Sequence, residues 1–186
     1  MTRIVAGQFG GRRLVAPTGG GTRPTSERVR EGLFSTLESL TDLAGARFAD
    51  LYAGSGVVGL EACSRGADHV LLVESDPRAV RAARANITAL GVADRVRLLP
   101  GRVGAVLAAG ADAPYDVVFA DPPYALADAE LTELQAALLA GGWLAPDAVV
   151  VIERTRRSGP LTWVESITAD RTRRYGDTVL WYGRRS

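Results

Sequence analysis

The chain contains no lysine, one cysteine and one histidine in 186 residues. With Cys63 as the sole thiol, no disulfide within the chain is possible, and a zinc cluster that needs several thiolates is a poor explanation. With His69 as the sole imidazole, a histidine-based catalytic triad and a multi-histidine metal site are equally poor explanations. We therefore expect an activity that needs no bound metal.

Long apolar runs are also missing. No run approaches the roughly 18 residues of a transmembrane helix, and residues 1–7 lack the apolar stretch of a signal peptide. We therefore expect a cytoplasmic protein. The length, together with a hydrophobic content of 47%, fits one core of ordinary size.

Charge is distributed unevenly, although the net charge is only +1. Residues 1–30 contain six arginines and one acid, and residues 153–186 contain eight arginines and four acids. The intervening segment contains eight arginines and 16 acids. Basic ends fit phosphate contact, because the planar guanidinium group binds two oxygens at once. An ordinary solvated surface is the alternative interpretation.

Strand and helix patterns alternate along most of the chain, which predicts βαβ units and a largely parallel sheet of the α/β class. The expected strands are 47–52, 69–74, 96–99, 115–120 and 148–153, and the expected helices are 26–40, 57–65, 77–89, 102–109 and 128–140. Two further β segments, 161–165 and 178–182, fit an antiparallel hairpin at the sheet edge.

The N-terminal residues have a different pattern. Residues 2–17 predict a β-hairpin, and the glycine-rich residues 17–24 a connector. Either Thr25 or Ser26 is a suitable cap for the helix that follows. We therefore divide the chain into a hairpin extension, 1–22, which we expect to be an arm that contacts nucleic-acid phosphates, and an α/β domain, 23–186.

A glycine-rich turn follows the first expected strand. Glycine lets a ligand approach the backbone closely, and the helix N-terminus after the turn attracts a carboxylate or a phosphate. Asp50 is placed to hold an ammonium group, and Glu74, which ends the next strand, can accept both hydroxyls of a ribose. The candidate cofactor residues here are Asp50, Tyr52, Ala53, Gly54, Ser55, Gly56, Glu74, Ser75 and Asp76, of which Asp76 also suits a helix cap.

These groups match the ammonium, carboxylate and ribose of S-adenosylmethionine. The spacing Gly54-x-Gly56-x-x-Gly59 also matches the dinucleotide fingerprint, so NAD is an alternative cofactor. Nothing else in the sequence indicates hydride chemistry.

The tetrapeptide Asp121-Pro122-Pro123-Tyr124 ends the apolar strand 115–120. Its two prolines make a stiff corner that presents a carboxylate, backbone carbonyls and an aromatic ring. Oxygens of Asp121 and Pro122 can orient an exocyclic amine, Asp121 or water can accept the released proton, and Tyr124 can stack on the extruded base. A simple strand-ending turn is the alternative interpretation. The catalytic candidates are therefore Asp121, Pro122, Pro123 and Tyr124, with Asp121 also beside the cofactor.

Most of the candidate RNA-binding residues are arginines of the N-terminal region, where a guanidinium group can contact phosphates and the hairpin tip can touch bases. They are Arg3, Gln8, Arg12, Arg13, Arg23, Arg28 and Arg30.

With both motifs placed, the chain resembles the bacterial 16S rRNA (guanine-N2)-methyltransferase D family, over residues 3 to about 182. The resemblance is carried by Gly11-Arg12-Arg13-Leu14, by the segment 23–31 (Arg-Pro-Thr-Ser-Glu-Arg-Val-Arg-Glu), by the glycine turn 50–56 and by the tetrapeptide 121–124. The segment 23–31 distinguishes this family from other methyltransferases.

The resemblance implies a Rossmann-like class I methyltransferase with a seven-stranded sheet and helices on both faces. It also implies S-adenosylmethionine as methyl donor and a guanine of 16S ribosomal RNA as target, within an assembling small subunit. Many class I enzymes have an Asp after the third strand that binds adenine. This chain has Gly101-Arg102-Val103 there, so we expect backbone groups at these positions to bind the adenine.

Three alternatives remain open on the sequence. The Asp-Pro-Pro-Tyr corner also serves adenine-N6 methylation of DNA, although those enzymes usually carry an extra recognition segment. A non-catalytic RNA-binding assembly factor could keep the same fold, but the intact Asp50, Glu74 and Asp121 argue against it. A dinucleotide oxidoreductase is the third and weakest alternative.

Overall fold

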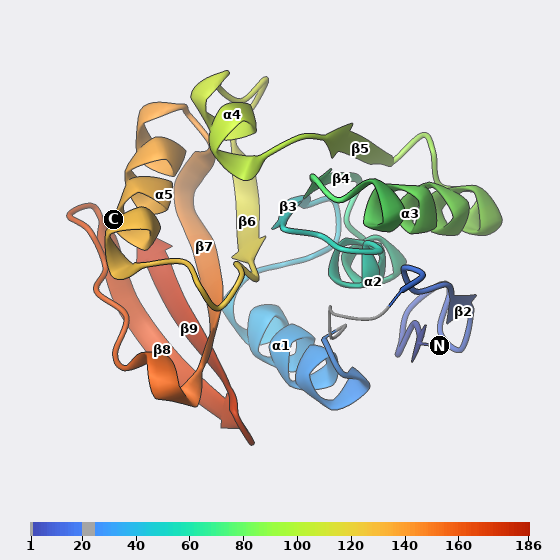
Figure 1. Ribbon diagram of the computed structural model, residues 1–186, viewed down its shortest axis with the longest axis horizontal. Coiled ribbons are helices and arrows are strands. Elements are labelled where there is room, and N and C mark those ends of the chain that lie inside the picture. The colour runs from blue at the N-terminus through green and yellow to red at the C-terminus, as the bar shows by residue number, and fades with distance from the viewer. Residues whose placement is uncertain (1, 20–24) are drawn as a thin grey trace.

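The structure is a computed structural model that describes residues 2–19 and 25–186. Its centre is a seven-stranded sheet in the order β5-β4-β3-β6-β7-β9-β8 (Figure 1). The strands are β3 (Arg47–Leu51), β4 (His69–Glu74), β5 (Val96–Pro100), β6 (Tyr115–Ala120), β7 (Leu144–Thr155), β8 (Ile167–Tyr175) and β9 (Thr178–Arg185). The first five pair in parallel, and β9 pairs antiparallel with both β7 and β8. The expected seven-stranded α/β fold is confirmed.

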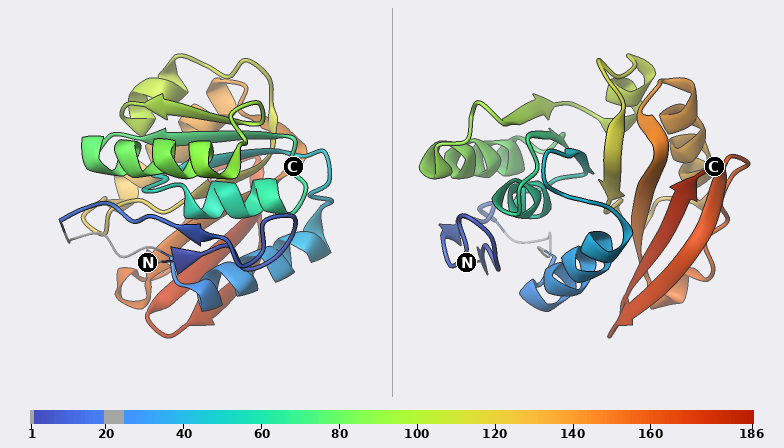
Figure 2. Two further views of the ribbon diagram at one scale, coloured as in Figure 1. Left: turned by 90° about the vertical axis from the view of Figure 1, so that its right-hand side faces the viewer. Right: turned by 180° about the vertical axis from the view of Figure 1, so that it is seen from behind.

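Helices cover both faces of the sheet (Figure 2). They are α1 (Glu27–Leu40), α2 (Val57–Ser64), α3 (Pro77–Leu90), α4 (Val103–Ala108), α5 (Asp128–Ala140) and a short 3₁₀ turn, η1 (Arg156–Ser158). One apolar cluster joins α1, α2 and α3 to one face, and a second joins α4 and α5 to the other. Within the described residues, no helix has the length and apolar character to cross a bilayer.

Local sequence explains where α1 begins. The Ser26 hydroxyl accepts a hydrogen bond from Val29 N at 3.2 Å, as an N-cap does. Leu33, Phe34 and Leu37 then follow at helical spacing and are fully buried. Because Ser26 is the cap, the side chain of Thr25 remains available for another contact.

The order of the strands determines where a ligand can bind. The chain runs outward from β3 through β4 to β5 and then returns to the other side of β3 as β6. Such a reversal leaves a crevice beyond the carboxyl ends of the two central strands. The glycine turn follows β3 and Asp121 follows β6, so both motifs lie at this crevice.

The N-terminal hairpin is β1 (Thr2–Arg3) paired antiparallel with β2 (Arg13–Leu14), as expected. It is packed into the domain, because Ile4 and Leu14 belong to the same apolar cluster as α1, α2 and α3. The fully buried Glu61 of α2 accepts hydrogen bonds from Val5 N at 2.8 Å and Ala6 N at 3.0 Å. The expected boundary between residues 22 and 23 lies outside the described residues.

The C-terminal strands correct one expectation. Residues 161–165, expected to be a β segment, form no strand, and the edge strand is instead β8. β8 contains Arg171, Arg173 and Arg174, and its residues are mostly exposed or half-buried. An edge strand needs little apolar side-chain burial, so a search for apolar runs misses it.

Candidate active site

A cavity of about 680 Å³ opens at the carboxyl ends of β3, β4 and β6. Its volume lies in the range of small-molecule sites, roughly 300–1,000 Å³. The lining residues come from both sequence motifs and from the region that leads into α1: Pro17, Thr25, Asp50, Tyr52, Ala53, Gly54, Ser55, Val57, Val58, Glu74, Ser75, Phe119, Asp121, Pro122, Pro123 and Tyr124. The structure thus brings the glycine turn and the Asp-Pro-Pro-Tyr corner to one cavity.

The glycine turn has a left-handed backbone. Tyr52, Gly54 and Gly56 have φ values of 61°, 60° and 86°. A Cβ built on Gly54 would meet no atom within 4 Å, so this glycine leaves open space beside the cavity. Gly56 is the N-cap of α2 and supplies no side-chain cap. Of the first backbone N–H groups of α2, Gly59 N is bound by Asp50, and an anionic ligand can accept from those of Val57 and Val58.

Asp50 is an acid with no cation beside it in the described residues. Its side chain lines the cavity although the residue is only 1% exposed, and its Oδ2 accepts a hydrogen bond from Gly59 N at 2.8 Å. Burial, with a smaller contribution from the nearby acids Asp121 and Glu74, raises the pKa of Asp50 to about 8. A cationic group in the cavity would stabilise the ionised form of Asp50.

The carboxylate of Glu74 is held by three backbone donors. Oε1 accepts from Gly54 N at 2.7 Å, and Oε2 accepts from Ser75 N at 2.8 Å and Asp76 N at 2.7 Å. A carboxylate has about four acceptor positions, so these bonds fix its orientation and leave little acceptor capacity unused.

Asp121 and the two prolines form one wall of the cavity. The Asp121 N–H donates to the Leu51 carbonyl at 3.3 Å, which joins the ends of β6 and β3. Burial raises the pKa of Asp121 to about 7. An acid with a pKa near neutrality is suited to proton transfer at physiological pH.

Two aromatic residues flank this wall. Phe119 is buried and lies on the same face of β6 as Asp121, because alternate residues of a strand share a face. Tyr124 is 68% exposed and lies at the opening. The corner therefore presents a ring at the mouth and an apolar wall behind it, an arrangement that can receive a flat base.

Five of the expected cofactor residues do not line this cavity: Gly56, Asp76, Gly101, Arg102 and Val103. Asp76 caps α3, where its Oδ1 accepts from Arg78 N at 2.9 Å. Gly101 N donates to the Glu74 carbonyl at 2.9 Å. Val103 is the first residue of α4 and is buried in the apolar cluster that joins α4 and α5 to the sheet. An adenine contact by residues 101–103 stays a prediction.

Sequence reasoning missed five residues that line the cavity: Pro17, Thr25, Val57, Val58 and Phe119. The alternation of side chains along β6 could have identified Phe119. Val57 and Val58 could have been identified because they are the first two residues of the helix that follows the glycine turn. Thr25 could not be placed, because Thr25 and Ser26 were equally suitable caps and the choice depends on the packed structure.

The expected RNA-binding residues differ in exposure. Arg3, Gln8, Arg12, Arg13 and Arg28 are exposed, and Arg23 lies outside the described residues. Arg3 pairs with Glu27 at 3.2 Å, and Arg12 Nη2 donates to the Ala89 carbonyl at 2.8 Å.

The structure corrects the expectation for Arg30. Its side chain is 0% exposed and pairs with Glu61 at 3.1 Å. Its Nη2 donates to Thr2 Oγ1 and to the Arg3 carbonyl, each at 2.8 Å. A guanidinium group buried in this way cannot reach an RNA phosphate, so the prediction that Arg30 binds RNA is wrong. The residue instead ties α1 to the hairpin and to α2.

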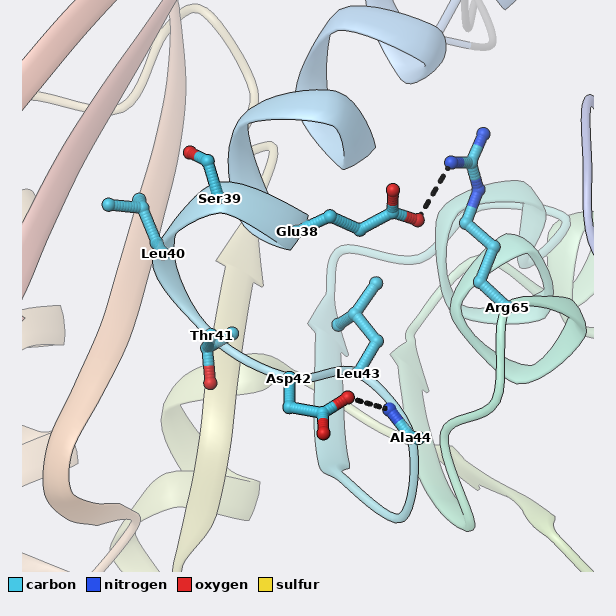
Figure 3. Close-up of a pocket in the computed structure, with 8 residues that line it drawn as sticks. All are labelled: Glu38, Ser39, Leu40, Thr41, Asp42, Leu43, Ala44 and Arg65. Atoms are coloured by element: carbon cyan, nitrogen blue, oxygen red, sulfur yellow. Dashed lines mark hydrogen bonds and ion pairs between the residues drawn. The ribbon is translucent and has the colours of Figure 1, made fainter.

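A second cavity, of about 510 Å³, lies between the end of α1 and the loop that leads into β3 (Figure 3). Its charged groups already have partners, because Glu38 pairs with Arg65 at 3.1 Å and Asp42 accepts from Ala44 N at 2.9 Å. It lies at the amino end of β3, away from both motifs, and we assign it no function. Among the described residues, no group of histidines, cysteines and acids could hold a metal.

Comparisons with known proteins agree with this architecture. The family model described as "Conserved hypothetical protein 95" matches residues 2–184. An Escherichia coli K12 protein named "Ribosomal RNA small subunit methyltransferase D" is 36% identical over 165 residues, which span 87% of this chain and 80% of that protein.

Solved structures give the same picture. The chain described as "Putative methyltransferase yhhF from Escherichia coli" matches with a TM-score of 0.86 and 32% identity, covering 100% of this chain and 98% of that one. An RNA methyltransferase from Salinibacter ruber, solved with S-adenosyl-L-homocysteine, has a TM-score of 0.64 at 24% identity over 87% of this chain and 93% of its own, which shows a shared fold.

Proposed function

This chain belongs to the Conserved hypothetical protein 95 family and to that of the ribosomal RNA small subunit methyltransferases D, and we propose that it methylates the exocyclic N2 amine of a guanine in 16S ribosomal RNA with S-adenosylmethionine as donor. The family resemblance drawn from the sequence is confirmed. The observation that carries the proposal is the single cavity that joins the glycine turn to Asp121-Pro-Pro-Tyr124.

The cavity fits the proposed cofactor. S-adenosylmethionine, when bound, supplies a methyl group on a positively charged sulfur. Asp50, buried without a cation beside it in the described residues, would hold the ammonium group. The first backbone N–H groups of α2, those of Val57 and Val58, would receive the amino-acid carboxylate. Glu74, oriented by three backbone donors, would accept from the ribose with its remaining capacity.

The corner after β6 supplies the chemistry of the acceptor. The lone pair of a guanine amine is delocalised into the ring, so the amine is a poor nucleophile until its hydrogens are held. Asp121 Oδ and the Pro122 carbonyl would accept those hydrogens, and Tyr124 would stack on the base at the mouth of the cavity. Asp121, with its pKa near 7, would then take the released proton.

Exposed arginines at both basic ends would hold the RNA backbone. Arg12, Arg13 and Arg28 are exposed on the hairpin and on α1. Arg156 and Arg157 are exposed on η1, directly after the carboxyl end of β7. The hairpin and the β8–β9 turn lie on opposite sides of α1 (Figures 1 and 2). η1 adjoins that turn, because Arg156 N donates to the Asp177 carbonyl at 2.8 Å. An RNA at the cavity would therefore have a basic surface on either side.

The central test is methyl transfer from labelled S-adenosylmethionine to unmodified 16S RNA, to small-subunit particles and to DNA. We expect transfer to RNA or particles and a single modified guanine N2 on mapping by mass spectrometry. Transfer to DNA adenine alone would contradict the proposal in favour of the DNA alternative. Binding of NAD without binding of S-adenosylmethionine would contradict it in favour of an oxidoreductase.

We expect Asp121→Ala to lower transfer by about 10²-fold or more, because the amine loses the group that orients it and accepts its proton. Calorimetry should show that the variant still binds S-adenosylmethionine. Glu133→Gln, which alters an exposed acid of α5, is the matched control and should retain full activity. Normal turnover by Asp121→Ala would remove the role assigned to Asp121.

A further inference from the structure

Glu153 occupies the carboxyl end of β7, directly beside Asp121. β6 and β7 pair in parallel, and Ala120 is opposite Ile152, so Asp121 and Glu153 are the next residues along the two strands. Neighbouring residues at one register position project to the same face of a sheet. This face carries α1 and α2, and it is the face on which the cavity opens.

The carboxyl group of Glu153 is buried, and one of its oxygens lacks a hydrogen-bond donor in the part of the chain that the structure describes. The residue is 8% exposed, and its Oε2 has no hydrogen-bond partner among the described residues. A side-chain hydrogen bond joins the carboxyl group to Thr25, which lines the cavity. A buried carboxylate oxygen without a donor is costly, whereas the same oxygen carrying a proton becomes a donor itself.

The charges around Glu153 favour its protonated form. The charged groups that act on it are both acids, Asp121 directly after β6 and Asp50 on β3. Glu74, on β4, adds a third acid at the same edge and acts on Asp50. Arg154 follows Glu153 and therefore projects to the other face of the sheet, and Arg30 of α1 is bound to Glu61. Two adjacent buried carboxyl groups cannot both ionise cheaply, so one of them keeps a proton.

We propose that Glu153 is a positioning residue for methyl transfer: it stays protonated and donates from Oε2 to the carboxylate of Asp121, which keeps Asp121 ionised and oriented toward the amine. Asp121 is the ionised member because it lines the cavity, where the amine donates to it. Burial, together with the neighbouring acids Asp121 and Asp50, raises the pKa of Glu153, which agrees with a protonated Glu153.

This inference rests on the proposed function. It changes neither the bonds that form and break in the reaction nor the destination of the proton. The amine nitrogen forms a bond to the methyl carbon, the carbon–sulfur bond breaks, and its electron pair stays on sulfur. The proton leaves the amine for Asp121. Glu153 keeps its own proton throughout and acts through the hydrogen bond that it donates.

The protonation order can be measured in the unaltered protein by carbon-13 NMR of the carboxyl groups, with Asp121→Asn and Glu153→Gln used to assign the two signals. We expect Glu153 to remain protonated through pH 7 and Asp121 to titrate first. A Glu153 that is ionised well below neutrality would overturn the inference. This measurement needs no catalysis, so it stands even if the RNA substrate is not the one proposed.

The role in positioning is tested with two variants of similar size. Glu153→Gln keeps a donor beside Asp121, and Glu153→Met removes it. Without the donor, the ionised form of Asp121 is less stable, so the Met variant should raise the pKa of Asp121 by about one unit, while the Gln variant leaves it close to the original value.

The same shift should appear in the rate of methyl transfer. The acidic limb of the kcat/KM profile should move by about one pH unit toward higher pH in Glu153→Met and not in Glu153→Gln. A merely structural role would lower the thermal stability of both variants and leave the limb in place, and that result would contradict the proposal. If the unaltered protein transferred no methyl group to any RNA while NMR showed that Asp121 titrates before Glu153, the result would refute the proposed function but not the protonated state of Glu153.

Discussion

Arg28 and Arg30 are two residues apart on α1 and have opposite environments. Arg28 is exposed, whereas Arg30 is fully buried. The position of Arg30 follows from helical spacing, because it lies three, four and seven residues before Leu33, Phe34 and Leu37. The prediction that Arg30 binds RNA rested on its charge and not on its place on that apolar face. The sequence therefore contained the signal that Arg30 is buried.

Replacing Arg30 should destabilise the protein strongly. Arg30→Met removes one of the two guanidinium partners of the buried Glu61 carboxylate, which keeps only Arg65, and it removes the donors to Thr2 Oγ1 and the Arg3 carbonyl. We expect the free energy of unfolding to fall by about 3–5 kcal/mol, measured by urea denaturation. Arg28→Met is the control, and its change should stay within about 0.5 kcal/mol. Equal small losses in both variants would mean that the buried pair is not structural.

At the scale of single elements, most strand and helix bounds were predictable and the C-terminal hairpin was only partly so. Apolar alternation and helical spacing identify β3 to β7 and the helices, because those elements bury a face. The edge strand β8 has no such face, and its register with β9 depends on tertiary pairing. The same limit applies to Thr25, whose contact with Glu153 forms only once α1 is packed against β7.

The packing of α2 on the sheet gives a prediction for Gly59. A Cβ at this position would lie 2.3 Å from Leu72 Cδ2 and 3.3 Å from the Cβ of Asp50. Gly59→Ala should therefore push α2 from the sheet, lower the free energy of unfolding by about 1–3 kcal/mol and weaken binding of S-adenosylmethionine through Asp50. Chemical denaturation and calorimetry measure the two effects.

Gly104→Ala is the matched control, because its Cβ would meet no atom within 4 Å and the residue lies in α4. An alanine in a helix should raise stability by about 0.5–1 kcal/mol. If Gly59→Ala were as stable as Gly104→Ala, the close packing of α2 against β4 would not matter for the fold.

At the scale of the whole molecule, the uneven charge of the sequence becomes a spatial arrangement. The basic segments are far apart along the chain, and in the fold the hairpin and the β8–β9 turn lie on opposite sides of α1 (Figure 1). The charge pattern predicted phosphate contact in general terms. It could not predict which arginines are exposed, since burial depends on how the hairpin packs against α1 and α2.

This arrangement predicts the salt dependence of RNA binding. Each phosphate contact contributes a slope of about −0.7 to the logarithm of affinity against the logarithm of salt concentration for a single strand. Replacing both Arg156 and Arg157 with Gln should reduce the magnitude of the slope by about 1.4 and weaken binding. Arg97→Gln, an exposed arginine on β5 at the opposite side of the sheet, should leave the slope unchanged. An unchanged slope in the double variant would restrict RNA contact to the hairpin side.

Asn86 of α3 joins the hairpin to the glycine turn. Its side chain accepts from Val15 N at 2.8 Å and donates to the carbonyls of Val15 and Ser55, each at 3.0 Å. The segment that leaves the hairpin and the loop beside the cofactor cavity therefore share one anchor. If a bound nucleic acid displaced that segment, it would either break these bonds or move the Ser55 peptide. Binding at the hairpin and binding in the cofactor cavity are therefore linked through the side-chain amide of Asn86.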